Sequence, residues 1–233
     1  MKRVYAYAMT AAVLIAAAAA VIGAVRRLPV QPTVLRDSGL PVTTVLLDAG
    51  HGGADGGAVA PDGTAEKGIN LDIALRARDM LRFFGYKVRM TRESDVSLHD
   101  ASAATAREQK VSDMHRRLEL YNQADLVISI HQNKFGQAKY RGIQVFYSPN
   151  HPAGEPFAAV LRETMLSLLQ PENTRELKRG DRSIFLLYKT TAPAVLVECG
   201  FLSNPEELAD LKREEYRQEL AWAMTCGVLR GGW

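Results

Sequence analysis

The stretch Thr43–Gly57, TTVLLDAGHGGADGG, decides the fold because it joins a short apolar run to a loop rich in glycine. A β-branched and leucine run that is closed by glycines is typical of a buried strand entering a loop. The run stops at Asp48, and His51 follows in the loop, where glycine lets the backbone approach a ligand closely. Open α/β sheets place their sites where strands end, so one imidazole is presented at such a place. Taken alone, a turn with an ordinary histidine explains the stretch equally well.

The same arrangement recurs twice along the chain. His131 directly follows the apolar run Leu126–Ile130, LVISI, and Glu198 directly follows Ala194–Val197, AVLV. Strands that are apolar on both faces predict a sheet covered by helices on both sides. Three side chains able to bind a metal or transfer protons each follow such a strand, which favours a functional site over three unrelated solvated strand ends.

The segments between these runs predict an alternation of strands and helices. A helical pattern after Glu66 stops near Gly85, and Tyr86–Thr91 is predicted as a strand, which indicates a right-handed crossover between parallel strands. The other predicted elements are strands over Gly142–Tyr147 and Ser183–Tyr188 and helices over Arg116–Gln123, Glu155–Leu169 and Glu214–Leu229. The predicted apolar face of the helix Glu155–Leu169 consists of Phe157, Val160, Leu161, Met165 and Leu168.

Local signals add detail around these elements. Asn204 is predicted to cap a helix that begins at Pro205, with Glu207 completing a capping-box-like arrangement. The polar segment Glu93–Met114 has no clear period and is predicted as a partly helical surface excursion, serving as a lid, a docking surface or a plain loop. The basic run Asn173–Arg182 is interpreted as a solvated face or as a rim that binds an anionic polymer.

Charge excludes nucleic acid as a partner. The chain has 29 Lys and Arg against 26 Asp and Glu, but Lys2, Arg3, Arg26 and Arg27 all precede residue 28, before which there is no acid. Removing those four leaves 25 basic against 26 acidic residues, so the rest of the chain is near neutral. A near-neutral domain has no basic surface of the kind that binds nucleic acid.

The first residues are predicted to be a targeting segment. Val4–Val25 is continuously apolar and long enough to span a bilayer as a helix. Residues 1–27 are therefore interpreted as a signal peptide or an uncleaved membrane anchor, and either one predicts export. Residues 28–41 contain three prolines and are predicted as a stiff linker, so that 42–233 forms one domain.

The two cysteines do not indicate a catalytic thiol. Cys199 and Cys226 are the only cysteines, and a bridge between them stays open as an alternative to two free thiols. Cys199 follows Glu198 along a predicted strand, so the two side chains should point to opposite faces of the sheet.

The three polar residues and Glu66 fit a metal-dependent hydrolase. A catalytic zinc site needs three protein ligands and one open position, which His51, Glu66 and His131 can supply. Glu66 can instead serve only to stabilise the N-terminus of the helix that follows it. A carboxylate beside the metal, here Glu198, can take a proton from water and deliver a proton to a leaving amine. These roles suit amide hydrolysis, and they rest on shared placement at strand ends, not on an HExxH helix.

Five segments of this chain together resemble one known family. They are LDAGHGGADGGA, EKGINLDIA, MTRESD, RLELYNQADLVISIHQN and AVLVECGFLSNPEE, within Val45–Leu229. The chain resembles the zinc-dependent N-acetylmuramoyl-L-alanine amidases of the Amidase_3 family. The resemblance implies Zn²⁺ as cofactor, with His51, Glu66 and His131 as its ligands and Glu198 as the catalytic residue. It also implies a three-layer α/β/α fold with a mixed, mostly parallel sheet of about six strands.

The resemblance implies a substrate and a setting as well. The family cleaves the amide between the lactyl group of N-acetylmuramic acid and L-alanine in peptidoglycan. Within it, the chain looks most like the spore-cortex amidases, because a bare catalytic domain follows one apolar leader and because of the stretch from Thr174 to Glu207. That group prepares muramic acid for the muramic-δ-lactam of the cortex, which a deacetylase completes and which serves germination.

The partners expected from the resemblance are peptidoglycan, an activator or lipoprotein, and the membrane if the leader is retained. The expected location is extracytoplasmic, membrane-anchored or secreted, and between the forespore and mother-cell membranes if the protein is specific to sporulation. Another zinc hydrolase of the cell wall, a peptidase or deacetylase, and a non-catalytic peptidoglycan-binding domain stay open as alternatives.

Smaller roles are predicted for other polar residues. Asp48 either fixes a ligand's orientation from behind the site or is a polar strand end. Asn133 either contacts substrate or holds the His131 loop. Arg92 and Arg117 are predicted as structural ion-pair partners. His99, His115 and His151 are predicted to be solvated.

Overall fold

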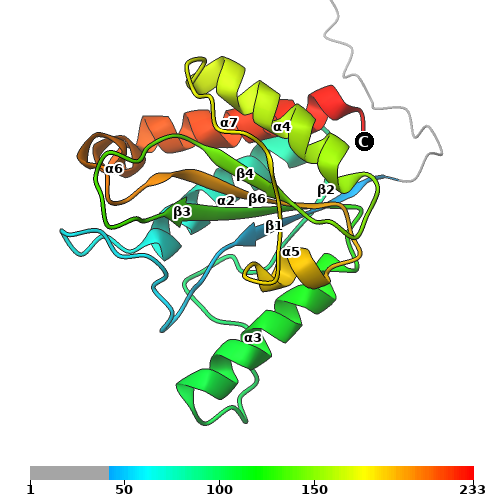
Figure 1. Cartoon of the computed structure of the whole chain (residues 1–233). Helices are drawn as coiled ribbons and strands as arrows, with labels where there is room; N and C mark the ends of the chain where they lie inside the picture. Colours follow the sequence, from blue (N-terminus) through cyan, green and yellow to red (C-terminus); the bar gives the residue numbers. More distant parts are fainter. Residues whose placement is uncertain (1–41) are drawn as a thin grey trace, which may run out of the picture. The chain divides into compact units, whose positions relative to one another are not determined.

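The computed structural model describes residues 42–233 (Figure 1). The predicted signal peptide or anchor over 1–27 and nearly all of the predicted linker over 28–41 lie outside the described residues. Within 42–233, no helix combines the length and apolar character needed to cross a membrane.

One mixed sheet of six strands forms the centre of the domain, in the order β2-β1-β3-β6-β4-β5. Neighbouring strands are parallel except β4 and β6, which are antiparallel, so the predicted mostly parallel sheet is confirmed. The strands are β1 Thr44–Ala49, β2 Lys87–Met90, β3 Leu126–Asn133, β4 Gln144–Tyr147, β5 Lys178–Arg179 and β6 Ala194–Phe201.

Helices cover both faces of the sheet, which makes the predicted three layers (Figure 1). One layer holds α2 Glu66–Phe83, α4 Gly154–Leu169 and α7 Glu214–Gly231, and the other holds α3 Ala106–Tyr121 and α5 Phe185–Lys189. Alternation along β1 explains the two cores, because Val45 and Leu47 pack on the first layer while Leu46 packs on the second.

Two helix ends follow the signals in the sequence. Gly85, with φ of 90°, lies just after α2 where the stop was predicted. Asn204 caps α6 Pro205–Lys212 by accepting hydrogen bonds from the amides of Glu206 and Glu207. The capping box predicted for Glu207 is wrong, because its carboxylate instead accepts the amides of Gly142 and Phe201, each at 2.8 Å.

Three other predictions of secondary structure need correction. Ser183–Tyr188 was predicted as a strand but lies largely in helix α5, because a short apolar run fits either structure. Helix α3 begins at Ala106, ten residues before the predicted start, after a capping box of Thr105 and Glu108. Leu168 is 52% exposed and is not part of the buried face of α4.

Candidate metal and catalytic site

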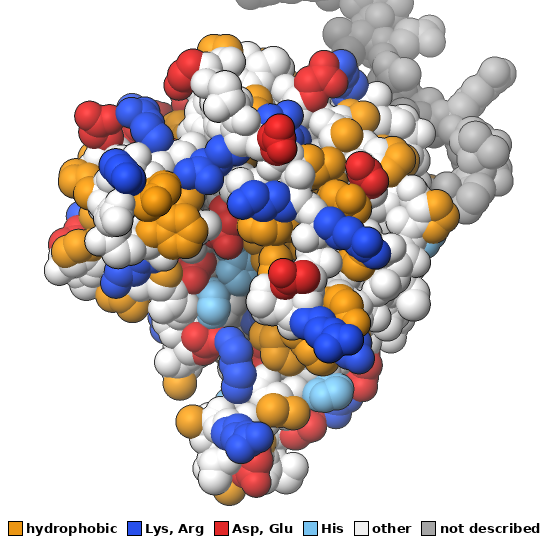
Figure 2. Space-filling model, in the orientation of Figure 1, with side chains coloured by type: hydrophobic (Ala, Val, Ile, Leu, Met, Phe, Trp, Pro, Cys, Tyr) orange, Lys and Arg blue, Asp and Glu red, His pale blue; other side chains and the backbone are white. Residues whose placement is uncertain are grey.

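The polar residues that were predicted to follow the central strands lie together at one end of the sheet. His51 comes two residues after β1, while His131 and Glu198 lie within β3 and β6, which run past the predicted strand ends. The register pairs His131 directly with Glu198, so both side chains leave the sheet on the same face. Figure 2 shows histidine and acidic side chains together in a hollow of the surface, with Lys and Arg side chains around it.

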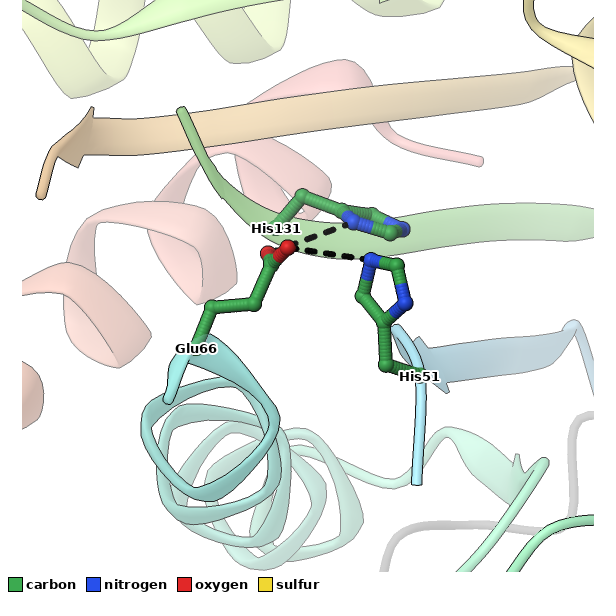
Figure 3. Close-up of side chains that lie close together, drawn as sticks. All are labelled: His51, Glu66 and His131. Carbon is green, nitrogen blue, oxygen red and sulfur yellow. Dashed lines mark ion pairs between the residues drawn. The ribbon is translucent and has the colours of Figure 1, made fainter. Parts of the chain in front are cut away.

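Helix α2 brings Glu66 to the two histidines (Figure 3). Glu66 is the first residue of the helix, and its Oε1 lies 3.0 Å from Nε2 of His51. Its Oε2 lies 3.5 Å from Nδ1 of His131. One potential ligand atom from each residue lies within 4.8 Å of the others, a spacing that could hold a metal ion. The structure thus brings together all three residues named from the sequence.

Glycines make the room for this cluster. A Cβ on Gly57 would lie 2.3 Å from Oε1 of Glu66 and 2.6 Å from Cδ2 of His51. A Cβ on Gly50 would lie 2.3 Å from the ring of His131. His51 itself has φ of 63° and is the one non-glycine residue with positive φ in 42–233. Such strain persists where the surroundings hold a residue in place, and it is common at functional sites.

Three hydrogen bonds from groups other than the histidines fix the carboxylate of Glu66. Oε1 accepts the amide of Ala58 at 2.7 Å, and Oε2 accepts the amide of Gln132 at 2.8 Å and Nδ2 of Asn70 at 3.2 Å. Burial acts to raise the pKa of Glu66, but its two histidine neighbours outweigh burial and hold the pKa well below its usual range. Glu66 is therefore ionised, as a carboxylate ligand must be.

Asp55 orients the ring of His51, a role that was not predicted from the sequence. Its Oδ2 lies 2.9 Å from Nδ1 of His51, and Lys110 of α3 contacts the same oxygen. Burial acts to lower the pKa of His51, but the hydrogen bonds with Asp55 and Glu66 raise it to about 9. Nδ1 is engaged by a carboxylate while Nε2 points at Glu66, which is the usual arrangement of a metal-binding histidine. The signal for this role was an aspartate four residues after the histidine in a glycine-rich loop.

The donor set fits a zinc ion. Two imidazoles and one carboxylate form one of the common three-ligand sets of catalytic zinc, which leaves one position open. The outer contacts that such a site needs are present: Asp55 is hydrogen-bonded to His51, and the amide of Gln132 donates to Glu66.

Asp48 supports the site from behind without touching either histidine. Its carboxylate is buried, pairs with Arg117 and accepts the hydroxyls of Thr91, Tyr121 and Ser129. Arg117 links Asp48 to the loop that carries His51, since its Nη2 donates to the carbonyl oxygen of His51 at 2.7 Å.

Of the two arginines predicted as ion-pair partners, only Arg117 is one; its second partner is Asp113. Arg92 is buried but donates to backbone carbonyls, among them those of Ala49, Gly50 and Lys67. It is therefore a structural clamp on the loop that carries His51, and its predicted ion pair is wrong.

Glu198 is a half-buried residue with one buried, unsatisfied carboxylate oxygen. Its Oε2 has no hydrogen-bond partner among the described residues, and burial raises the pKa of Glu198 to about 7. A carboxyl group with a pKa near neutrality can both accept and donate a proton at physiological pH. Cys199 lies on the opposite face with a pKa raised by burial, and both it and Cys226 are free thiols, so no disulfide joins them.

The other polar residues singled out from the sequence, Asn133 and three histidines, lie outside the cluster of possible metal ligands. Asn133 holds its loop, since its side chain accepts the amide of Lys134 and its carbonyl accepts the amide of Leu202. His115 is exposed as predicted, whereas His99 and His151 are half-buried, with ring contacts to Ser97 and to the amide of Ala153.

Comparison with known proteins gives consistent matches. Residues 45–230 match the Amidase_3 family, described as N-acetylmuramoyl-L-alanine amidase. The germination-specific N-acetylmuramoyl-L-alanine amidase of Bacillus subtilis (strain 168) is 37% identical over 188 residues, which cover 80% of this chain and 78% of the relative. The amidase AmiA of Escherichia coli (strain K12) is 28% identical over 229 residues, covering 79% and 74%. The structure of the CwlD amidase from Clostridioides difficile, in complex with the GerS lipoprotein, matches with a TM-score of 0.78 and 38% identity, covering 81% of this chain and 98% of that one.

Proposed function

The chain belongs to the Amidase_3 family of N-acetylmuramoyl-L-alanine amidases, and from this premise we propose that His51, Glu66 and His131 hold a zinc ion while Glu198 moves the protons of the reaction. As a cell-wall amidase, the enzyme acts on peptidoglycan. The bond proposed to break is the amide that joins the lactyl group of N-acetylmuramic acid to L-alanine. The observation that carries the proposal is the convergence of three ligand atoms within 4.8 Å of one another.

The proposed ligands are prepared for a metal by their neighbours. Glu66 is ionised and fixed by two backbone amides, and Asp55 holds the ring of His51 so that Nε2 faces the site. When bound there, a zinc ion supplies a Lewis acid that polarises the amide carbonyl and activates water for attack.

Glu198 is proposed to act first as a base and then as an acid. Its carboxylate takes a proton from the attacking water as the new carbon–oxygen bond forms. The protonated carboxyl then delivers a proton to the nitrogen of L-alanine as the carbon–nitrogen bond breaks. The products are a free lactyl carboxylate and a peptide with a free amino end. A pKa of about 7 suits both steps, because neither protonation state is strongly favoured at neutral pH.

The proposed biological setting is the spore cortex. The support is the similarity to a germination-specific amidase and to the CwlD amidase, each at more than 35% identity. In this setting, peptide removal precedes a deacetylase that completes the muramic-δ-lactam needed for germination. A lipoprotein partner is proposed by analogy with the complex of CwlD and GerS. The enzyme would be exported, with residues 1–27 as signal peptide or anchor, and would work between the forespore and mother-cell membranes.

Product analysis tests the bond and the setting. The purified chain with zinc is incubated with vegetative and cortex-type peptidoglycan, and the products are identified by mass spectrometry. We expect free stem peptides that begin at L-alanine, and none after chelation. New ends at another bond would instead indicate a zinc peptidase or deacetylase. Zinc binding without any product would support a peptidoglycan-binding role or a missing activator.

A further inference from the structure

Three exposed aromatic side chains form a patch far from the catalytic cluster. Phe83 is 82% exposed, Phe84 39% and Trp222 43%. Their rings contact one another, with centroids 5.3 Å apart for Phe83 and Phe84 and 6.2 Å apart for Phe84 and Trp222. These three residues, here called the aromatic patch, line a shallow groove together with Met80. Clustered exposed aromatics are uncommon on a monomeric soluble domain and mark a contact surface.

The aromatic patch and the catalytic cluster lie at opposite ends of helix α2. Glu66 is the first residue of α2, and Phe83 is the last. A helix of 18 residues is about 27 Å long, so the patch lies roughly that far from Glu66. Trp222 completes the patch from α7, which packs along α2 (Figure 1).

The aromatic patch lies at the end of the sheet where the described chain begins. The turn that follows Phe84 leads into β2, where the amide of Lys87 donates to the carbonyl of Thr43 at 3.2 Å. The described residues begin at Val42, next to Thr43. The point at which residues 1–41 join the domain is therefore at the same end of the sheet as the patch. The catalytic side chains lie at the opposite end of the sheet.

The sequence attached there indicates what the patch contacts. Val4–Val25 is long enough to span a bilayer. Only the 14 residues Leu28–Pro41 separate that region from the domain, and fully extended they reach at most about 50 Å. Over so short a tether, a bilayer is present at a high effective concentration, so even weak affinity for it suffices.

The chemistry of the patch suits a lipid surface. Phe and Trp are the side chains that insert into the region between headgroups and acyl chains. Arg82 and Lys87 are exposed beside the patch, and within 42–233 neither is in an ion pair with a carboxylate. Asp79, the acid in the groove, is paired with Arg78 at 2.8 Å. Unpaired basic groups next to exposed aromatics favour anionic phospholipid headgroups.

We propose that the aromatic patch docks on the phospholipid bilayer that holds residues 4–25. Docking at this end of the sheet turns the opposite end, which carries the catalytic side chains, away from the lipid. His51, Glu66 and His131 are then directed toward the surrounding wall polymer. The inference rests on retention of the N-terminal segment and is independent of which bond the enzyme cleaves.

Trp222 provides a direct test, because Trp222 and Trp233 are the only tryptophans in the chain. A full-length Trp233→Phe variant, with residues 1–41 retained, is reconstituted in phosphatidylcholine–phosphatidylglycerol vesicles. We expect blue-shifted emission from Trp222 and its quenching by phospholipids brominated near the headgroup. The difference between wild type and Trp222→Phe gives the same signal if Trp233→Phe does not fold.

Paired variants separate docking from mere tethering. Phe83→Ser combined with Phe84→Ser is expected to abolish the quenching while circular dichroism is unchanged. The matched control Phe135→Ser removes an aromatic that is 47% exposed elsewhere and should leave the quenching intact. Unquenched Trp222 in the otherwise native chain would overturn the proposal, as would equal quenching in the double variant. A lipid-independent, concentration-dependent shift with dimers in ultracentrifugation would assign the patch to a second copy instead.

Discussion

The position of His51 depends on three neighbouring residues. Asp55 holds Nδ1 of His51 at 2.9 Å, Arg117 holds its carbonyl at 2.7 Å, and Gly57 leaves room for its ring. His51, Glu66 and His131 could be predicted from the sequence because each stands at the end of an apolar run or at the start of a helix. Asp55 was not predicted although it stands four residues after the histidine, because its contact with the ring depends on the conformation of a loop in which His51 has a positive φ.

At this scale, Asp55→Asn tests the support of the metal site. The variant removes the carboxylate that orients His51, so we expect zinc affinity to fall by about 10- to 100-fold. Competition with a chromophoric chelator measures it. Asp62→Asn, which changes an exposed aspartate paired with Lys212, is the control and should bind zinc as the wild type does. Unchanged affinity in Asp55→Asn would show that Asp55 has no role in positioning.

Asp48→Asn tests the buried ion pair behind the site. Burial acts to raise the pKa of Asp48, but Arg117 and two hydroxyls outweigh it and hold the pKa well below its usual range. A group whose pKa is lower in the folded state stabilises the fold above its unfolded pKa, near 4, and loses that contribution as the pH falls. We therefore expect Asp48→Asn to lose about 3–5 kcal/mol at pH 7, because Arg117 is left buried and less well paired.

Denaturant unfolding at several pH values checks this expectation. The gap in unfolding free energy between wild type and Asp48→Asn should narrow from pH 7 to pH 3, because Asp48 becomes protonated in the unfolded wild-type chain while it stays ionised in the folded one. Asp79→Asn, at an exposed surface pair, should lie within about 0.5 kcal/mol of wild type. A gap that is constant with pH would contradict the assignment of the effect to the charge of Asp48.

Among the elements, α6 shows how one cap organises two loops. Asn204 accepts the amides of Glu206 and Glu207, and its Nδ2 donates to the carbonyl of Ala138 at 2.8 Å. Glu207 then reaches back to Gly142 and Phe201, tying the loop after β3 to the end of β6. The cap was predictable from Asn-Pro at a helix start. The role of Glu207 was not, because the amides it accepts are 6 and 65 residues away in the chain.

Asn204→Ala is the corresponding prediction for this element. Loss of the cap is expected to cost about 1 kcal/mol. For a domain of this size, that lowers Tm by roughly 2–4 °C in a thermal scan. Asn204→Asp keeps the capping oxygen and should retain most of the stability. An equal loss in both variants would show that the contact with Ala138, not the cap, is what matters.

The errors in predicting elements have a common physical cause. Helix α5 is only five residues long, and its apolar run fits a strand as well as a helix, so tertiary packing decides. Helix α3 has a strongly polar surface; its buried residues are Asp113, Arg117 and Tyr121, and its apolar residues Met114, Leu118 and Leu120 are only partly buried. Because its apolar stripe is weak, such a helix is hard to predict from hydrophobic periodicity. Its capping box at Thr105 was nevertheless visible in the sequence.

At the scale of the whole molecule, the sheet was the most predictable feature. Apolar runs at β1, β3 and β6 predicted a sheet buried on both faces, and these three strands are adjacent in the observed order. That the sheet is mixed followed only from the family resemblance, and the antiparallel pairing of β4 with β6 was not predicted, since nothing local to Gln144–Tyr147 specifies direction.

Residues 42–233 are predicted to fold without the preceding segment. They contain all six strands and both cores, and Pro41–Trp233 forms one compact unit. We expect this fragment to unfold in one cooperative thermal transition, with calorimetric and van't Hoff enthalpies that agree. Two transitions, or a fragment that does not fold, would contradict the domain boundary at residue 42.

The most direct test of the catalytic account is the turnover and zinc content of Glu198→Gln. The substitution keeps the size of the side chain and removes its ability to exchange a proton, while leaving His51, Glu66 and His131 in place. The account predicts one zinc ion per chain as in the wild type, with kcat on peptidoglycan lowered by about 10²- to 10⁴-fold. Turnover close to wild type would show that Glu198 is not the proton carrier, and loss of zinc would show that its role is structural.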